Sequence, residues 1–130
     1  MRDISKNLLA AISIDPQTIS SDTTTNGTGV DVRDYDGVMV LFQSNDAVTD
    51  GTFALKIQES DDDSTYTDVD SSEQIGTLSS FTSSAEGTQQ IGYVGNKRYV
   101  RPVITSTSTS SGGILMANVI RGLPHAAPTS

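Results

Sequence analysis

The sequence predicts an all-β fold, namely a single antiparallel β-sandwich of jelly-roll-like form with extended arms at its two ends. Ser and Thr account for 34 of the 130 residues, and both suit extended strands and turns better than long helices. Short apolar stretches recur between turn signals every 8 to 12 residues or so, which is typical of a sandwich or barrel with about seven to nine strands. The predicted sandwich spans residues 19–121, between an N-terminal arm at 1–18 and a tail at 122–130.

The N-terminal arm is predicted to be extended, although Ser5–Ala11 also fits a short helix. The apolar run Leu8–Ile14 lacks a convincing small-residue cleavage site, so no signal peptide is predicted. The polar stretch Thr18–Gly29 follows, and Asn26–Gly27 within it predicts a hairpin turn. We therefore expect this stretch to form an exposed turn or loop.

Two predicted strands, Val38–Phe42 and Ile114–Arg121, are apolar on both faces. Such a pattern marks a strand that is covered on both sides, either at the centre of a sandwich or at a contact with another subunit. Two more strands are predicted at Gln89–Val94 and Arg98–Thr105. Pro102 has no N–H to give to a ladder, so it predicts that the last of these strands lies at a sheet edge or has a bulge.

The stretch Phe53–Val69 predicts a β-hairpin. Phe53, Leu55 and Ile57 alternate with small or polar residues, which is the period of a strand with one buried face. The run Ser60–Ser64 then supplies side chains that bond their own backbone in tight turns, before a β-favouring composition resumes.

The polar stretch at residues 70–87 predicts a loop. Ile75, Leu78 and Phe81 recur at intervals of three, which permits a helical turn, but the Ser, Thr and Gly around them weaken that interpretation. We expect these three apolar residues to anchor the loop to the core.

The formal net charge is −8, and 12 of the 16 carboxylates lie between Asp31 and Glu73. Because nucleic acids and anionic membranes carry negative charge, neither is expected as the main partner. A group of basic residues fits either a patch that docks on an acidic protein surface or isolated surface cations. These residues are Lys97, Arg98, Arg101 and Arg121.

One hypothesis for the acidic cluster is a calcium site, because hard cations favour clustered carboxylate oxygens. The cluster comprises Asp61, Asp62, Asp63, Asp68, Asp70 and Glu73. An EF-hand loop that began at Asp61 would have Tyr66 at its glycine position and Ser72 at its twelfth position, so that pattern fails. We expect a solvated hairpin loop with no metal and no other cofactor.

No catalytic constellation is predicted, and we expect the protein not to be an enzyme. His125 is the only histidine, it lies in the predicted tail beside Pro124, and the chain has no cysteine. A hydrolytic triad needs a base that is held rigidly against a nucleophile, and a tail does not provide this.

The run LKIQESDDDSTYTDV, followed by IGYVGNKRYVRPVIT, a glycine-containing turn, a closing strand and a proline-rich end, resembles small head decoration or cement proteins of tailed bacteriophages. The resemblance covers Val38–Pro124. It implies a virion protein, made in the host cytoplasm, that sits on the outer surface of an icosahedral capsid and strengthens it. The implied partners are the major capsid protein and further copies of the chain, as a dimer or trimer.

The predicted contacts to the capsid or to a sister subunit lie mainly in the two ends of the chain, because free termini are usually frayed unless a partner holds them. They are Leu8, Leu9, Ile12, Ile14, Leu123 and Pro124, with Tyr99 and Arg101 as further candidates. The alternatives are a phage tail or fibre component and a carbohydrate-binding β-sandwich module. The second of these usually stacks sugars on aromatic faces, and this chain has four Tyr, three Phe and no Trp.

Overall fold

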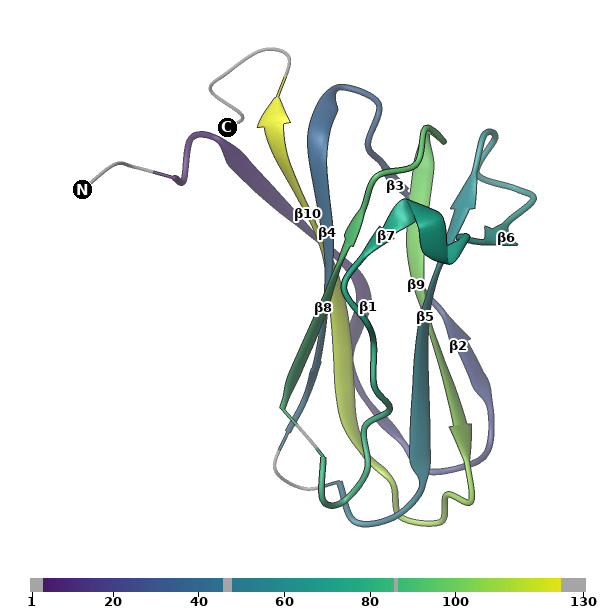
Figure 1. Ribbon diagram of the computed structural model, residues 1–130. Helices are drawn as coiled ribbons and strands as arrows, with labels where there is room; N and C mark the ends of the chain where they lie inside the picture. The colour runs from purple at the N-terminus through teal and green to yellow at the C-terminus, as the bar shows by residue number, and fades with distance from the viewer. Residues whose placement is uncertain (1–3, 46–47, 86, 125–130) are drawn as a thin grey trace.

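Two antiparallel sheets pack face to face in the computed structural model, which describes residues 4–45, 48–85 and 87–124 (Figure 1). Sheet A has the strand order β1-β10-β4-β8-β7, and sheet B has the order β2-β9-β5-β6, with the short β3 also paired to β9. The elements are β1 (Leu8–Ile19), β2 (Thr24–Asn26), β3 (Val30–Asp31), β4 (Tyr35–Ser44), β5 (Thr52–Ser60), β6 (Thr67–Asp68), the 3₁₀ turn η1 (Ser71–Glu73), β7 (Gln74–Ile75), β8 (Thr88–Tyr93), β9 (Tyr99–Thr107) and β10 (Gly113–Pro124).

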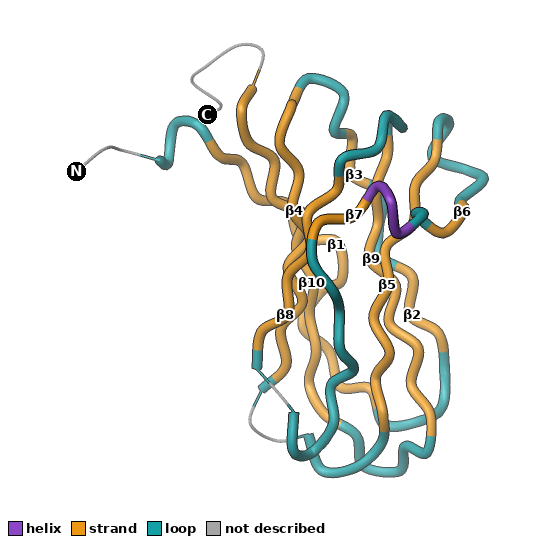
Figure 2. Tube along the Cα trace, in the orientation of Figure 1, coloured by secondary structure: helices purple, strands orange, loops and turns teal. Residues whose placement is uncertain are grey.

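The predicted all-β sandwich is confirmed. Figure 2 shows strands and loops throughout the described chain, with η1 as its one helical turn. No helix in the described ranges has the length and apolar character needed to cross a membrane.

The strands pair as a ribbon that is doubled back on itself, which is the arrangement of a jelly roll. The outermost pair is β1 with β10, and nested inside it are β2 with β9, β4 with β8, and β5 with β6. Rolling up this ribbon brings β10 beside β4 and β9 beside β5. The predicted jelly-roll-like form is therefore the observed topology, and the short β3 and β7 are added to it.

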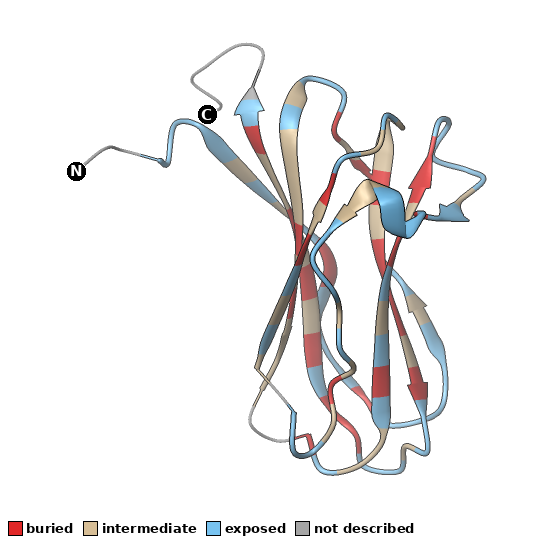
Figure 3. Ribbon diagram, in the orientation of Figure 1, coloured by how far each residue is buried: buried red, intermediate tan, exposed pale blue. Residues whose placement is uncertain are grey.

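The core lies between the sheets and is built from alternate residues of the long strands. Figure 3 shows this alternation along the long strands, where buried bands are separated by intermediate or exposed ones. The largest side chains with almost no exposed surface are Phe42, Phe53, Phe81, Ile14, Ile57, Ile91, Ile104 and Leu115. Full burial of such a side chain contributes about 1.5–3 kcal/mol, so the apolar interior is the main stabilising feature.

The predicted hairpin is observed as β5 and β6, and its loop is held by side-chain bonds to nearby backbone. Ser60 Oγ accepts from the N–H groups of Asp62 and Asp63 at 3.2 and 3.1 Å. Asp62 Oδ1 accepts from the N–H groups of Ser64 and Thr65, both at 3.0 Å. These backbone donors, Thr65 foremost, hold the pKa of Asp62 below its usual value.

The expected edge position of the strand with Pro102 is wrong, whereas the alternative of an irregular register at Pro102 is found on one side of the strand, where the pairing shifts by one residue between Asn26 opposite Val103 and Val30 opposite Val100. Strand β9 lies between β5 and the pair β2 and β3, and its register with β5 is unbroken. The Pro102 carbonyl accepts from Gly27 N–H at 2.8 Å, so the ring nitrogen of Pro102 faces the same side. Gly27 lies between the end of β2 and the start of β3. Pro102 therefore faces a gap between two ladders, and its lack of an N–H group removes no ladder hydrogen bond.

The predicted hairpin turn at Asn26–Gly27 is also wrong. Strand β2 ends at Asn26, and Gly27 is buried against the opposite sheet rather than exposed in a turn. A Cβ atom at Gly27 would lie 2.3 Å from Ser13 Oγ and 2.8 Å from the Pro102 ring. Glycine is thus needed here for close approach of two strands, a need that the local sequence does not reveal.

The ends of the chain are strands of the sandwich where they are described, which corrects the predicted boundaries at residues 18 and 122. Strand β1 pairs with β10 from Leu8 opposite Gly122 to Ile19 opposite Gly113. The extended form is confirmed over residues 8–11, in place of the helix that Ser5–Ala11 also allowed. The apolar residues that were assigned to a free N-terminal arm therefore belong to a strand that pairs with β10. Residues 1–3 and 125–130, with His125, lie outside the described residues.

One of the three predicted anchors of the loop at residues 70–87 is wrong. Phe81 is fully buried and exchanges backbone hydrogen bonds with Phe53 at 2.9 and 3.0 Å. Leu78 packs against the core as a partly buried residue. Ile75 is 64% exposed, because in β7 it pairs with Gly92 on the outward-facing side of sheet A.

Candidate docking surface

The outer face of sheet A carries no charged side chain at the described positions that its ladders pair. Side chains alternate between the two faces of a strand, and the fully buried Val40, Phe42, Ala117 and Val119 mark the inward positions of β4 and β10. None of the paired positions between such residues is Asp, Glu, Lys or Arg, although 18% of the chain is charged. We call this surface outer face A.

Outer face A is apolar over much of β1, β10 and β4, and its polar side chains are all uncharged, namely Thr18, Gln43, Thr88, Gln90 and Asn118. Its large apolar side chains are Leu8, Ile12, Met39, Leu41, Ile75, Ile114, Met116 and Ile120. Ile12 is 58% exposed and Ile114 is 42% exposed, whereas Met39 and Leu41 of the more central strand β4 are half-buried. Contiguous exposed apolar surface on a soluble chain marks an interaction site.

The outer face of sheet B, called outer face B, is polar by contrast. Arg101 donates twice to Gln58 Oε1, at 3.0 and 2.7 Å, and Gln58 Nε2 donates to Asp68 at 2.9 Å. Lys56 forms an ion pair with Asp68 at 3.1 Å. The Gln58 hydrogen bond and then Lys56 lower the pKa of Asp68. This network is typical of a face that meets water, so the two sheets present opposite chemistries.

An apolar groove of about 340 Å³ lies at one end of outer face A. Ile4, Leu8, Met39, Ile120 and Leu123 are among its lining residues. Figure 1 shows that β1, β4 and β10 extend beyond the body of the sandwich on the side of the two termini. Leu123 is 69% exposed and Ile4 is 67% exposed, so the groove is open to a partner.

Asn118 lies on outer face A, opposite Leu41 of β4 and Ile12 of β1. Its Oδ1 atom is buried and has no hydrogen-bond partner among the described residues. A buried polar atom without a partner costs about 1–3 kcal/mol. A donor from a docked protein would remove that cost.

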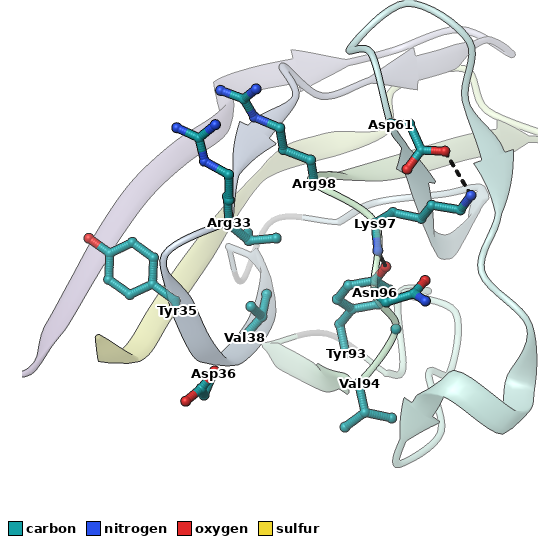
Figure 4. Close-up of a pocket in the computed structure, with 12 residues that line it drawn as sticks. Arg33, Tyr35, Asp36, Val38, Asp61, Tyr93, Val94, Asn96, Lys97 and Arg98 are labelled. Atoms are coloured by element: carbon teal, nitrogen blue, oxygen red, sulfur yellow. Dashed lines mark hydrogen bonds and ion pairs between the residues drawn. The ribbon is translucent and has the colours of Figure 1, made fainter. Parts of the chain in front are cut away.

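A second cavity of about 380 Å³ opens between the sheets at the same end of the sandwich (Figure 4). Lys97 Nζ pairs with Asp61 at 2.8 Å, and Arg98 pairs with Asp31 at 2.9 Å. The hydrogen bond from Arg98, together with the charge of that guanidinium, lowers the pKa of Asp31. In Figure 4 the guanidinium ends of Arg98 and Arg33 point away from the cavity rather than into it.

The four basic residues that a docking patch would need do not form one group, although Arg98 and Arg121 both contact Asp31. Lys97 and Arg98 line the cavity and form ion pairs with Asp61 and Asp31, and Arg101 lies on outer face B. Arg121 stacks 5.2 Å from the Tyr35 ring centre and donates to the Asp31 carbonyl at 3.2 Å. Two of them are therefore engaged in ion pairs, which favours the alternative of separate surface cations.

The carboxylates of the acidic cluster have separate partners. Asp61 pairs with Lys97, Asp62 caps its own loop, Asp63 accepts from the Tyr66 hydroxyl, and Asp68 pairs with Lys56. Asp70 caps η1 through Ser72 N–H at 3.2 Å. Within the described ranges, no group of three or more His, Cys, Asp or Glu side chains is placed to hold a metal ion.

Three half-buried tyrosines each have an arginine against the ring. The guanidinium carbon of Arg101 lies 4.0 Å from the Tyr66 ring centre, and that of Arg98 lies 5.0 Å from the Tyr99 ring centre. Tyr35 has Arg121 in the same role. Cation–π pairs of this kind occupy ring faces on which a sugar would stack.

The structure separates the predicted contact residues into three groups. Leu8, Ile12 and Leu123 are exposed on or beside outer face A. Ile14 is only 2% exposed and belongs to the core, so its prediction as a contact residue is wrong. Its inward direction follows from the register shift between Ile12 and Ile14, which a simple alternation does not predict.

The remaining predicted contacts do not share this surface. Leu9 is half-buried and pairs with Arg121, an inward position of sheet A. Tyr99 and Arg101 belong to β9 of sheet B. Pro124 ends β10 opposite Tyr35.

Sequence reasoning did not single out the central residues of outer face A, which are Met39, Leu41, Met116 and Ile120. The sequence does contain a pattern that points to these residues, because each lies in a stretch that is apolar on both strand faces.

Comparisons with family models, with curated proteins and with solved structures found no match.

Proposed function

We propose that the chain is a virion structural protein, which decorates the outer surface of an icosahedral bacteriophage capsid and stabilises it by bridging subunits of the major capsid protein. The observation that carries the proposal is the uncharged, apolar outer face A on an otherwise acidic chain. A jelly roll is also a fold that viral capsid domains use. Fold alone does not assign a function, so the argument rests on this surface.

The two outer faces suggest an orientation on the shell. Outer face A would lie against the major capsid protein, where burial of apolar surface contributes about 25 cal/mol per Å². Outer face B, with its network of Lys56, Gln58, Arg101 and Asp68, would face water. This arrangement places the charged side outward and leaves the neutral side for the contact.

The same charges disfavour other partners. A net charge of −8 opposes approach to a nucleic-acid backbone or to an anionic membrane. The proposal accordingly has no nucleic-acid or membrane partner and places the protein on the outer capsid surface after synthesis in the host cytoplasm.

The test is binding to undecorated shells by a matched pair of lysine variants. Met116→Lys places a charge on outer face A, and Thr105→Lys places one on outer face B; both residues are half-buried in long strands. Burying an unpaired charge in an interface is costly, so Met116→Lys should weaken co-sedimentation at least about tenfold. The Thr105→Lys protein should bind as the unaltered chain does.

Two outcomes would contradict the proposal. One is unchanged shell binding by Met116→Lys together with loss of binding by Thr105→Lys, which would assign the contact to the other sheet. The other is co-purification with tails rather than heads, which would assign the protein to the tail or to a fibre.

A further inference from the structure

The first half of β1 lies at the edge of sheet A. Of the four edges of the two sheets, three end in strands of two or three residues, namely β7, β6 and β2. Strand β1 has 12 residues and, among the described strands, pairs with β10 alone. A long edge of this kind is a template for another strand, and proteins normally protect it.

The protection that β1 has is confined to its second half. Asp15 and Pro16 lie there, next to register shifts on both sides of Ile14, and Ser13 O accepts from Thr28 N–H at 2.9 Å. Charges, proline and irregular register all discourage strand pairing. The stretch Leu8–Ile12, LLAAI, has none of these features and runs in unbroken register with β10.

The charge distribution indicates a second copy of the chain as the occupant. Each copy carries a net charge of −8, so two copies repel each other over most of their surfaces. Between residues 4 and 14 the only charged residue is Lys6, whereas 12 of the 16 carboxylates lie between Asp31 and Glu73. Electrostatic repulsion between two copies is therefore weakest when they approach along β1. An acidic partner of another kind would find no opposite charge on this neutral edge.

We infer that two copies of the chain form a dimer by antiparallel pairing of β1 with β1, about a two-fold axis that passes through Ala10. The two-fold symmetry limits which residues of the two β1 strands can lie opposite each other. Opposite residues of an antiparallel pair lie on the same face, so a residue of outer face A in one copy must meet a residue of outer face A in the other. Ala10 then faces Ala10 of the partner subunit.

This register is self-complementary. Ala10 is small and exposed, so it lets the strands meet at the axis, and Leu8 of each copy lies opposite the partner's Ile12. Leu8 and Ile12 are 40% and 58% exposed in the single chain, and both gain apolar neighbours. Sheet A becomes continuous through the dimer, and so does outer face A. The pairing is independent of what outer face A binds.

Cysteine cross-linking tests the register in a chain that has no cysteine of its own. In Ala10→Cys the two thiols face each other across the axis, and mild oxidation should give a disulfide-linked dimer. In Ile12→Cys the two thiols are four residues apart along the strands, about 13 Å, and oxidation should leave monomers. Equal cross-linking of both variants, or none of Ala10→Cys above that of Ile12→Cys, would overturn the inference.

Light scattering tests the dimer itself. The unaltered chain should show the mass of a dimer, and Ala10→Asp should weaken the dimer at least about tenfold, because it places like charges directly opposite each other. Ala10→Ser is the matched control and should keep the dimer, and circular dichroism should show the same fold for all three proteins. A monomer at every concentration, a trimer, or a dimer that Ala10→Asp leaves unchanged would overturn the inference. Met116→Lys should keep the dimer, so failure here is distinguishable from failure of shell binding.

Discussion

Tyr93 of sheet A donates a hydrogen bond of 2.7 Å to Glu59 of sheet B, and both residues are almost completely buried. The Tyr93 hydroxyl also accepts from Lys97 N–H at 3.1 Å. Burial and then the hydrogen bond to Glu59 raise the pKa of Tyr93. This contact joins the two sheets at the end of the sandwich where the cavity between the sheets opens.

Removal of the Tyr93 hydroxyl should therefore destabilise the fold. Tyr93→Phe leaves the buried Glu59 carboxylate without this donor, which costs about 1–3 kcal/mol of unfolding free energy. Urea unfolding measures the loss. The matched control is the double variant Tyr93→Phe with Glu59→Gln, which has no buried carboxylate and should recover part of it. If the single and double variants lose the same free energy, the unpaired carboxylate of Glu59 is not what destabilises Tyr93→Phe.

Stability should fall in acid because several carboxylates accept hydrogen bonds in the folded state. Asp50 Oδ1 accepts from the N–H groups of Ser110, Ser111 and Gly112 at 3.0, 3.1 and 2.9 Å, and these donors, Gly112 first, lower the pKa of Asp50. A group whose folded pKa is depressed stabilises the fold above its unfolded pKa and loses that contribution as pH falls through the folded value.

The window for this loss begins near the unfolded value of 3.8 and extends below it. Urea midpoints should be constant from neutral pH to about pH 5 and should then decline. Asp50→Asn should flatten this decline, whereas Asp15→Asn should not, because Asp15 accepts no such set of backbone donors among the described contacts. A decline that is as steep in Asp50→Asn as in the unaltered protein would show that Asp50 does not contribute.

Features set by near neighbours in the sequence could be predicted, and features set by distant ones could not. Ser60 and Asp62 bond backbone groups within three residues, so the composition of the loop was enough to predict the hairpin. Gly27 is fixed by Ser13 and Pro102, far away in the chain, and its local sequence pointed to a turn instead. The same limit applies to Ile14, which a register shift turns inward.

The sequence predicted that strands of the candidate docking surface are covered on both faces, but it could not predict what covers them. Val38–Phe42 is apolar on both faces, which indicated a covered strand without deciding between the sandwich interior and a subunit contact. The register between β4, β10 and β8 resolves this, because it places Met39 and Leu41 on an outward face. Only the assembled sheet shows that this face is free of charge.

Truncation should distinguish a strand of the sandwich from a free arm. Deletion of residues 1–14 removes the buried Ile14 and half of β1, and it exposes the edge of β10. Loss of a buried aliphatic side chain alone costs about 2–5 kcal/mol. Thermal unfolding should show a large loss of stability, whereas deletion of residues 1–3 should leave the melting temperature nearly unchanged. Equal melting temperatures for the two deletions would mean that β1 contributes nothing to the fold.

Decorated shells should resist heat and internal pressure better than bare ones, if outer face A binds them as proposed. A protein that binds only the intact shell stabilises that state by mass action, and many weakly bound copies that bridge subunits add their effects through multivalency. Rupture temperature is measured for bare shells and for shells with the unaltered chain, Met116→Lys or Thr105→Lys. The unaltered chain and Thr105→Lys should raise the temperature by the same amount, while Met116→Lys should raise it less at the same protein concentration. Equal rupture of bare and fully decorated shells would contradict the mechanical role even if binding is tight, because the contact would then add no resistance to the shell.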